Sequence, residues 1–199
     1  MTPSLKVRAV RAFYKPRRYL WAVWSWVYRA VFHRKYSKVE LPHHLSADEA
    51  SDHMEALTWT KDAVQELWDS MGTAHWVQHC LNEIDAGRGQ PEGALDCDDF
   101  SAWAVAVLDP KLKPQIWCLS WVLPEGDIKG HAMCMGRDVE TDEYFHVGNW
   151  GYMGPFGSFD AMVRATLKRA GAQDIVAWAT LSGDLFPSET GLTYPGDKG

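Results

Sequence analysis

One stretch of the sequence, residues 95–108 (LDCDDFSAWAVAVL), constrains the fold more than any other. Asp96 can cap the start of a helix, and Asp99 follows three residues later, which is the spacing of a capping box. Residues 100–108 are almost all apolar or small, so this helix is expected to be buried on most sides. Pro110 cannot continue a helix, which places the end near residue 108. The chain is therefore expected to fold around one buried, acid-capped helix.

Cys97 falls in the first turn of that helix. Backbone N–H groups and the helix dipole favour an anion at this position, which lowers the pKa of a thiol. Asp96, Asp98 and Asp99 act in the opposite direction, because like charges disfavour the thiolate. A nucleophilic Cys97 therefore needs a cation or a general base from another part of the chain. A plain buried cysteine is the alternative, since free cysteine is often buried.

Charge is distributed unevenly over the 199 residues. Residues 1–39 hold ten of the 20 Lys and Arg residues and no Asp or Glu, although the whole chain has a net charge of −6. We expect a basic, Trp-rich arm at 1–40, one folded domain at 41–182, and an irregular tail at 183–199 rich in Gly, Pro, Ser and Thr. Because the domain contains the predicted helices and strands, its core is expected to close without the arm.

The arm has two halves, a basic segment at residues 5–18 and an apolar segment at residues 19–32. Fourteen apolar residues are too few to span a bilayer, and no small-x-small cleavage site of an export signal follows. Tryptophans flanked by cations suit an anionic membrane surface or the groove of a protein partner, so residues 5–36 are the expected contact region. A helix laid on the protein's own core is the alternative. No motif supports nucleic-acid binding.

Four cysteines without a CxxC pair favour a reduced, intracellular environment, with two disulfides as the alternative. The expected location is therefore cytoplasmic; a virion-associated location and peripheral association with a membrane stay open. No cofactor and no metal site are predicted.

Helices come first along the domain and strands later, which predicts an α+β fold with an antiparallel sheet. A second capping box, Ser46 with Glu49, starts a helix expected at 47–57, and a third helix is expected from Ser158 to about Arg169. Two further helices are expected at 60–71 and 73–86, and strands at 115–123, 130–136, 143–149 and 174–181.

The segment RDVETD joins the second and third expected strands as a hairpin. A symmetric hairpin places His131 opposite Asn149 on one face, and His146 opposite Cys134 on the other. A cysteine at a helix N-terminus, a histidine that takes its proton and an Asn that orients the ring meet the needs of nucleophilic catalysis. We therefore predict that His131 faces Cys97.

The blocks DCDDFSAW, GHAMCM and EYFHVGNWG resemble those of the transglutaminase-like branch of the papain-like cysteine peptidases, as found in bacteria and phages. The resemblance covers roughly residues 46–150 and implies a papain-like core with Cys97 as nucleophile, His131 as base and Asn149 as orienting residue. Leu95 stands where the family usually has Gly, and Asn149 replaces the more usual Asp. Gln90, seven residues before the cysteine, is a candidate oxyanion donor, as a Gln is in papain-like enzymes; a solvated loop residue is the alternative.

The expected activity is thiol-dependent hydrolysis or acyl transfer at a peptide or isopeptide amide. GHAMCM followed by NWG is also similar to the cysteine, histidine-dependent peptidoglycan amidases, so a peptidoglycan-cleaving amidase or endopeptidase is one alternative. A catalytically inactive copy of the fold, acting as a structural or interaction module of virion type, is the other. The expected partner is a protein or peptide substrate.

Overall fold

The computed structural model describes residues 4–60, 71–93, 95–181 and 185–192. Its centre is one sheet of six strands in the order β4-β3-β2-β1-β5-β6, in which every neighbouring pair is antiparallel. The predicted α+β class with an antiparallel sheet is confirmed. The strands are β1 (Gln115–Val122), β2 (Ile128–Arg137), β3 (Tyr144–Gly148), β4 (Gly151–Phe156), β5 (Asp174–Leu181) and β6 (Pro187–Gly191).

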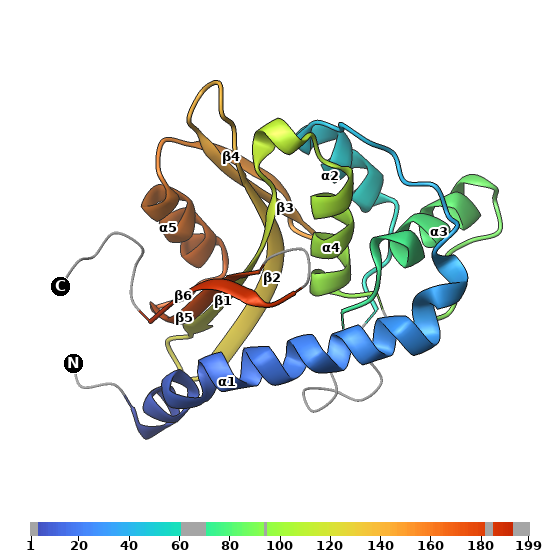
Figure 1. Cartoon of the computed structure of the whole chain (residues 1–199). Coiled ribbons are helices and arrows are strands. Elements are labelled where there is room, and N and C mark those ends of the chain that lie inside the picture. The colour runs from blue at the N-terminus through green and yellow to red at the C-terminus, as the bar shows by residue number, and fades with distance from the viewer. Residues whose placement is uncertain (1–3, 61–70, 94, 182–184, 193–199) are drawn as a thin grey trace.

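Helices cover both faces of this sheet. Helices α2 (Ala47–Glu55), α3 (Ala74–Asp85) and α4 (Cys97–Val107) share a core with one face, and α5 (Phe159–Arg169) packs on the opposite face (Figure 1). Strand β2 shows the division clearly, because its alternate side chains enter different cores. Ala132 and Cys134 lie on the α4 side, whereas Met133 and Met135 lie on the α5 side.

Helix α4 has the capping box that the sequence predicts. The Asp96 side chain accepts the N–H of Asp98 at 3.2 Å, and the Asp99 side chain accepts the N–H of Asp96 at 3.2 Å. Trp103 and Phe100 are 0% and 1% exposed, so the helix is buried as expected. The caps of α2 at Ser46 and of α5 at Ser158 are also confirmed.

The arm forms one long helix, α1 (Leu5–Tyr28), followed by the short helices η1 (Arg29–His33) and η2 (Arg34–Tyr36). Its inner face packs on the same core as β1, β2 and β5, with Tyr14 and Ala22 buried there. Arg11 donates to the carbonyl oxygens of Val176 at 3.0 Å and Ile175 at 3.1 Å. The arm therefore contributes side chains to the core of the domain. Within the described residues, no helix combines the length and apolar character needed to cross a bilayer.

Two expectations about the strands are wrong. Strand β6 lies inside the segment expected to be an irregular tail, where it pairs with β5 at the sheet edge despite its polar sequence. The β2–β3 register also differs by one residue, since Met135 lies opposite His146 and Cys134 opposite Val147. The reason lies in the turn: the N–H of Asp138 donates to the carbonyl of Glu143 at 2.9 Å, which leaves four residues in the loop, whereas the predicted register needs an odd number.

One strand of the sheet, β4, has no counterpart among the strands expected from the sequence. Strand β4, which the sequence did not predict, follows β3 directly after the two-residue turn Asn149–Trp150. Gly151 begins this strand with φ +81, a conformation that favours glycine. The helix expected at 60–71 falls almost wholly on residues outside the described part of the chain.

Candidate active site

Cys97 is the first residue of α4 and lies half-buried in a pocket of about 760 Å³. The pocket lies between α1, the N-terminal end of α4, and strands β1 and β2. Its lining includes Tyr14, Arg17, Arg18 and Trp21 from α1, Asp96 and Asp98 beside the thiol, Cys118 and Ser120 from β1, and residues 130–132 from β2. The thiol is thus placed at a helix N-terminus inside a cavity large enough for a small ligand or a peptide side chain.

Cations from the arm surround this cavity. Arg17, Arg18 and Lys6 line it from α1, and Lys129 lines it from β2. The Arg18 guanidinium carbon lies 5.2 Å from the centre of the Tyr14 ring and 5.5 Å from that of Trp21. The cation that Cys97 requires can therefore come from α1. The sequence analysis did not assign this role to any cation of the arm. The concentration of Lys and Arg in residues 1–39 is the feature of the sequence that could have indicated it.

Arg29 at the end of α1 acts on the acidic residues that follow Cys97. Burial lowers the pKa of Arg29, and the charges of Asp99 and Asp98 oppose that shift, so the three groups interact. The Arg29 Nε also donates to the carbonyl oxygens of Gly72 at 2.8 Å and Met71 at 3.2 Å. This arginine offsets the negative charge that the sequence places beside the thiol.

Gly72 fits into a narrow space between the arm and α4. Its N–H donates to Oδ1 of Asp99, and a Cβ at this position would lie 2.6 Å from that oxygen and 2.8 Å from Cε1 of His33. We expect Gly72→Ala to lower the free energy of unfolding by about 1–3 kcal/mol in urea denaturation, because these groups must move apart. Gly157→Ala is the matched control, since no atom lies within 4 Å of its added Cβ. Equal unfolding midpoints for both variants would contradict the expectation.

His131 lies on the other face of the sheet from Cys97. It pairs directly with Leu119 across β1 and β2, and paired residues of antiparallel strands project from the same face. Leu119 is buried in the core that holds α5, whereas Cys97 packs on the core that holds α1. The His131 ring stacks on Trp150, with ring centres 4.2 Å apart and planes at 20°. The strand register and this stacking therefore do not support the prediction that His131 faces Cys97, although His131 is among the residues that line the cavity of Cys97.

His131 and Asn149 are nevertheless neighbours. Burial lowers the pKa of His131 to about 4, and a hydrogen bond with the Asn149 side chain opposes this shift. Among the described residues, Nε2 of His131 is buried without a hydrogen-bond partner. His131 also lies close enough to His146 to lower the pKa of that second buried ring. The two residues expected to form the base and its orienting partner thus lie together, on the face away from the thiol.

Gln90 lies outside the group of described residues that line the cavity. Its Oε1 accepts the N–H of Thr58 at 2.7 Å, and its Nε2 donates to the carbonyl of Thr58 at 2.9 Å. Both ends of the amide are therefore engaged in joining two loops. This arrangement does not support Gln90 as an oxyanion donor.

In the described part of the chain, one group of three residues has the side chains of a metal site. Ligand atoms of Asp96, Cys97 and Asp98 lie within 4.8 Å of one another. Asp96 already serves as the cap of α4, which accounts for its position.

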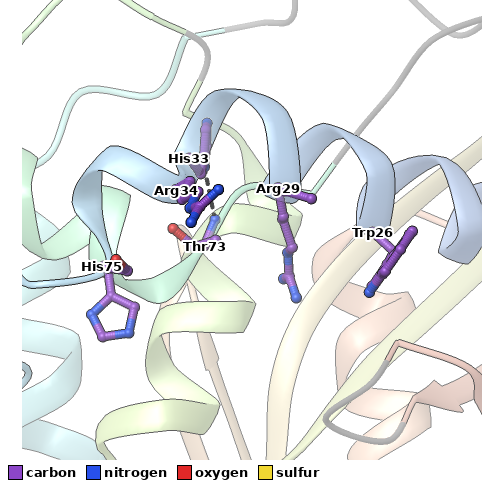
Figure 2. Close-up of a pocket in the computed structure, with 8 residues that line it drawn as sticks. Trp26, Arg29, His33, Arg34, Thr73 and His75 are labelled. Carbon is purple, nitrogen blue, oxygen red and sulfur yellow. Dashed lines mark hydrogen bonds between the residues drawn. The ribbon is translucent and has the colours of Figure 1, made fainter.

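A second, shallower pocket of about 430 Å³ lies at the C-terminal end of the arm, away from Cys97 (Figure 2). Its lining includes Trp26, Arg29, Arg34, Thr73 and His75. The N–H of Thr73 donates to Nδ1 of His33 at 3.1 Å, and Nδ1 of His75 lies 2.8 Å from the carbonyl oxygen of Val39. Figure 2 shows Trp26, Arg29 and Arg34 spaced along this end of the arm.

The comparisons with known proteins identify no family for this chain. No model of a protein family matches it. No curated protein matches it either. The resemblance to transglutaminase-like peptidases therefore depends on the cysteine, histidine and asparagine blocks quoted from the sequence.

Proposed function

We propose that the protein is a thiol-dependent hydrolase or acyl transferase acting on peptide or isopeptide amides, with Cys97 as its nucleophile. The observation that carries the proposal is the setting of Cys97, half-buried at the N-terminal end of α4 in a cavity lined by arm cations. The positive end of a helix and nearby guanidinium groups both favour a thiolate. A papain-like core, in which a cysteine-bearing helix packs on an antiparallel sheet, belongs to the same proposal.

The proposed reaction has two steps. The general base takes the thiol proton, the Cys97 thiolate attacks the amide carbonyl carbon and a C–S bond forms. The C–N bond then breaks as the base gives this proton to the leaving amine. Water or a second amine then attacks the thioester, which returns the acyl group to solution or to the acceptor and restores the thiol. Hydrolysis needs no second binding site, so it is the simpler outcome.

The base in this scheme is His131, oriented by Asn149, as the sequence resemblance implies. One observation opposes this part of the proposal, because the His131 ring stacks on Trp150 on the far face of β2. For His131 to act as base, its ring has to leave Trp150 and reach the Cys97 side. Arg18 lines the same cavity as Cys97 and His131, and its guanidinium offers a second source of thiolate stabilisation.

Trapping of an acyl-enzyme tests the proposal directly. The full chain is incubated with a panel of peptide amides and with a muropeptide, and intact mass and peptide mapping locate any adduct. We expect a thioester on Cys97 that is absent in Cys97→Ala and accumulates more slowly in His131→Gln. A chain that forms no adduct with any of these amides would contradict the proposal, and an adduct from the muropeptide alone would favour the peptidoglycan alternative.

A catalytically inactive copy of the fold is the second candidate, and the position of His131 favours it. An inactive copy needs no base opposite Cys97, and it can keep a buried, stacked histidine for packing. For this candidate we expect no adduct in the unchanged chain or in His131→Gln, and a lower stability of His131→Gln.

A further inference from the structure

The outward face of α1 is apolar over its whole length. At about 100° of rotation per residue, most of its exposed apolar residues lie opposite the buried residues Val7, Tyr14 and Ala22. Trp26 lies at one edge of this face, in line with Arg8. Monomeric proteins rarely expose so continuous an apolar surface. The exposed apolar stripe consists of Leu5 (81% exposed), Phe13 (69%), Leu20 (73%), Val23 (52%), Trp26 (67%) and Val27 (37%).

Cations flank this stripe on both sides. By the same rotation, Arg8 and Lys15 follow one edge and Lys6 and Arg17 the other, and all four are exposed. Arg34 and Lys35 continue the basic surface beyond the end of α1, and both are exposed. No acidic residue occurs in residues 1–39, although one of the flanking cations, Lys6, pairs with Asp127 of the domain at 3.3 Å.

The stripe is held in a fixed orientation by the inner face of the helix. Tyr14 donates to the carbonyl of Cys118 at 3.3 Å. Arg11 in the first half of α1 and Arg29, the residue that follows α1, also donate to backbone carbonyls. The arm runs along one border of the described part of the molecule (Figure 1). The apolar stripe and its cations therefore face outward while the protein keeps its fold.

We propose that this face of α1 binds the surface of an anionic phospholipid bilayer, with the helix axis parallel to the membrane plane. The side chains of this face match the layers of a bilayer surface. The apolar side chains would enter the acyl boundary, Trp26 would lie at the headgroup level, and the cations on both flanks would contact anionic lipids. A convex helix with like charge along both edges fits a flat anionic surface better than a groove. The proposal goes beyond the proposed function and does not depend on Cys97 chemistry.

Trp26 connects the stripe to the pocket at the end of the arm, which Arg34 also lines (Figure 2). An aromatic side chain and cationic side chains thus line one pocket where the stripe ends. Aromatic rings and cations are both favoured at the level of lipid headgroups.

Vesicle co-sedimentation of the full chain tests the proposal. Phosphatidylcholine vesicles with about 30% phosphatidylserine are compared with phosphatidylcholine alone. We expect binding to the anionic vesicles only, with release at raised salt because surface charge is screened. A variant carrying Leu20→Gln, Val23→Gln and Val27→Gln is expected to lose about tenfold or more in partition coefficient.

The matched control carries Val139→Gln and Leu192→Gln, two apolar residues that are 48% and 43% exposed outside the arm. It is expected to bind as the unchanged protein does, and equal melting temperatures show that both variants fold. Failure of the unchanged chain to bind anionic vesicles would overturn the proposal. So would equal binding by the α1 variant, or a dimer of the unchanged protein that the α1 variant loses. The Cys97→Ala variant is expected to bind anionic vesicles as the unchanged protein does. Vesicle binding can therefore succeed or fail independently of the proposed Cys97 chemistry.

Discussion

The protein is expected to lose stability steeply as the pH falls from about 6.5 to 4. Three buried histidines are responsible, because burial lowers the pKa of His33 to about 4, of His131 to about 4 and of His146 to about 3, all from 6.5. A lowered pKa in the folded state means that the unfolded chain binds more protons below pH 6.5. The contribution to stability is therefore complete above that pH and is lost as the pH falls toward the folded value.

The expected slope follows from the number of groups. Each contributes about 1.4 kcal/mol per pH unit in this window, so the three together contribute at most about 4 kcal/mol per unit. Urea unfolding at pH 7 and pH 5 measures the change. His146→Gln is expected to lower the pH dependence of the unfolding free energy by the contribution of one histidine. This variant also loses the contact of 2.9 Å between Thr166 Oγ1 and His146 Nε2. His43→Gln, an exposed histidine, is the control. A pH slope that is the same in both variants would show that buried histidines do not set it.

Tyr14→Ala is expected to lower the free energy of unfolding by about 3–5 kcal/mol, even though it lies in the arm. Tyr14 is 5% exposed, belongs to the core that includes Cys118 and Ala132, and its hydroxyl donates to the Cys118 carbonyl. Tyr14→Phe removes only the hydrogen bond and is expected to cost about 1 kcal/mol. Removal of residues 1–36 is expected to destabilise the protein more than Tyr14→Ala does.

This expectation differs from the sequence prediction that the core closes without the arm. Phe13→Ala is the matched control, because Phe13 is an aromatic residue of the same helix and is 69% exposed. Its free energy of unfolding is expected to change by no more than about 0.5 kcal/mol. If Tyr14→Ala behaves like Phe13→Ala, or if the chain without residues 1–36 melts at an unchanged temperature, the arm is an appendage as the sequence suggested.

Local signals predicted the elements of the fold well. Asp96 with Asp99 and Ser46 with Glu49 fix helix starts through contacts within four residues, and both capping boxes are found. The predicted β2–β3 register was wrong by one residue because the register depends on the turn, where Asp142 adopts φ +63 and the loop has an even number of residues, four. Strand β6 was not predicted because its sequence has no apolar pattern. Its place in the sheet depends on backbone pairing with β5.

The candidate site was predictable in part, for a similar reason. Cys97 was identified because its position depends on the local cap of α4. The face of the sheet on which His131 lies could not be predicted. Helices cover both faces of β2, so its apolar residues do not alternate with polar ones and give no indication of which face a residue occupies. Nor could the sequence place Arg18 in the cavity that holds Cys97, because this cavity brings together segments almost eighty residues apart and depends on how α1 packs.

The rate of Cys97 alkylation by iodoacetamide as a function of pH tests the proposed nucleophile most directly. Peptide mapping reports all four cysteines in one folded sample. Burial raises the pKa of Cys80 to about 12, so this thiol provides an unreactive internal reference. We expect Cys97 to react fastest near neutral pH, and Arg18→Gln to move its profile to higher pH while Arg8→Gln, an exposed cation of the same helix, does not. Labelling of Cys97 no faster than Cys80 or Cys118 would contradict its role as a nucleophile.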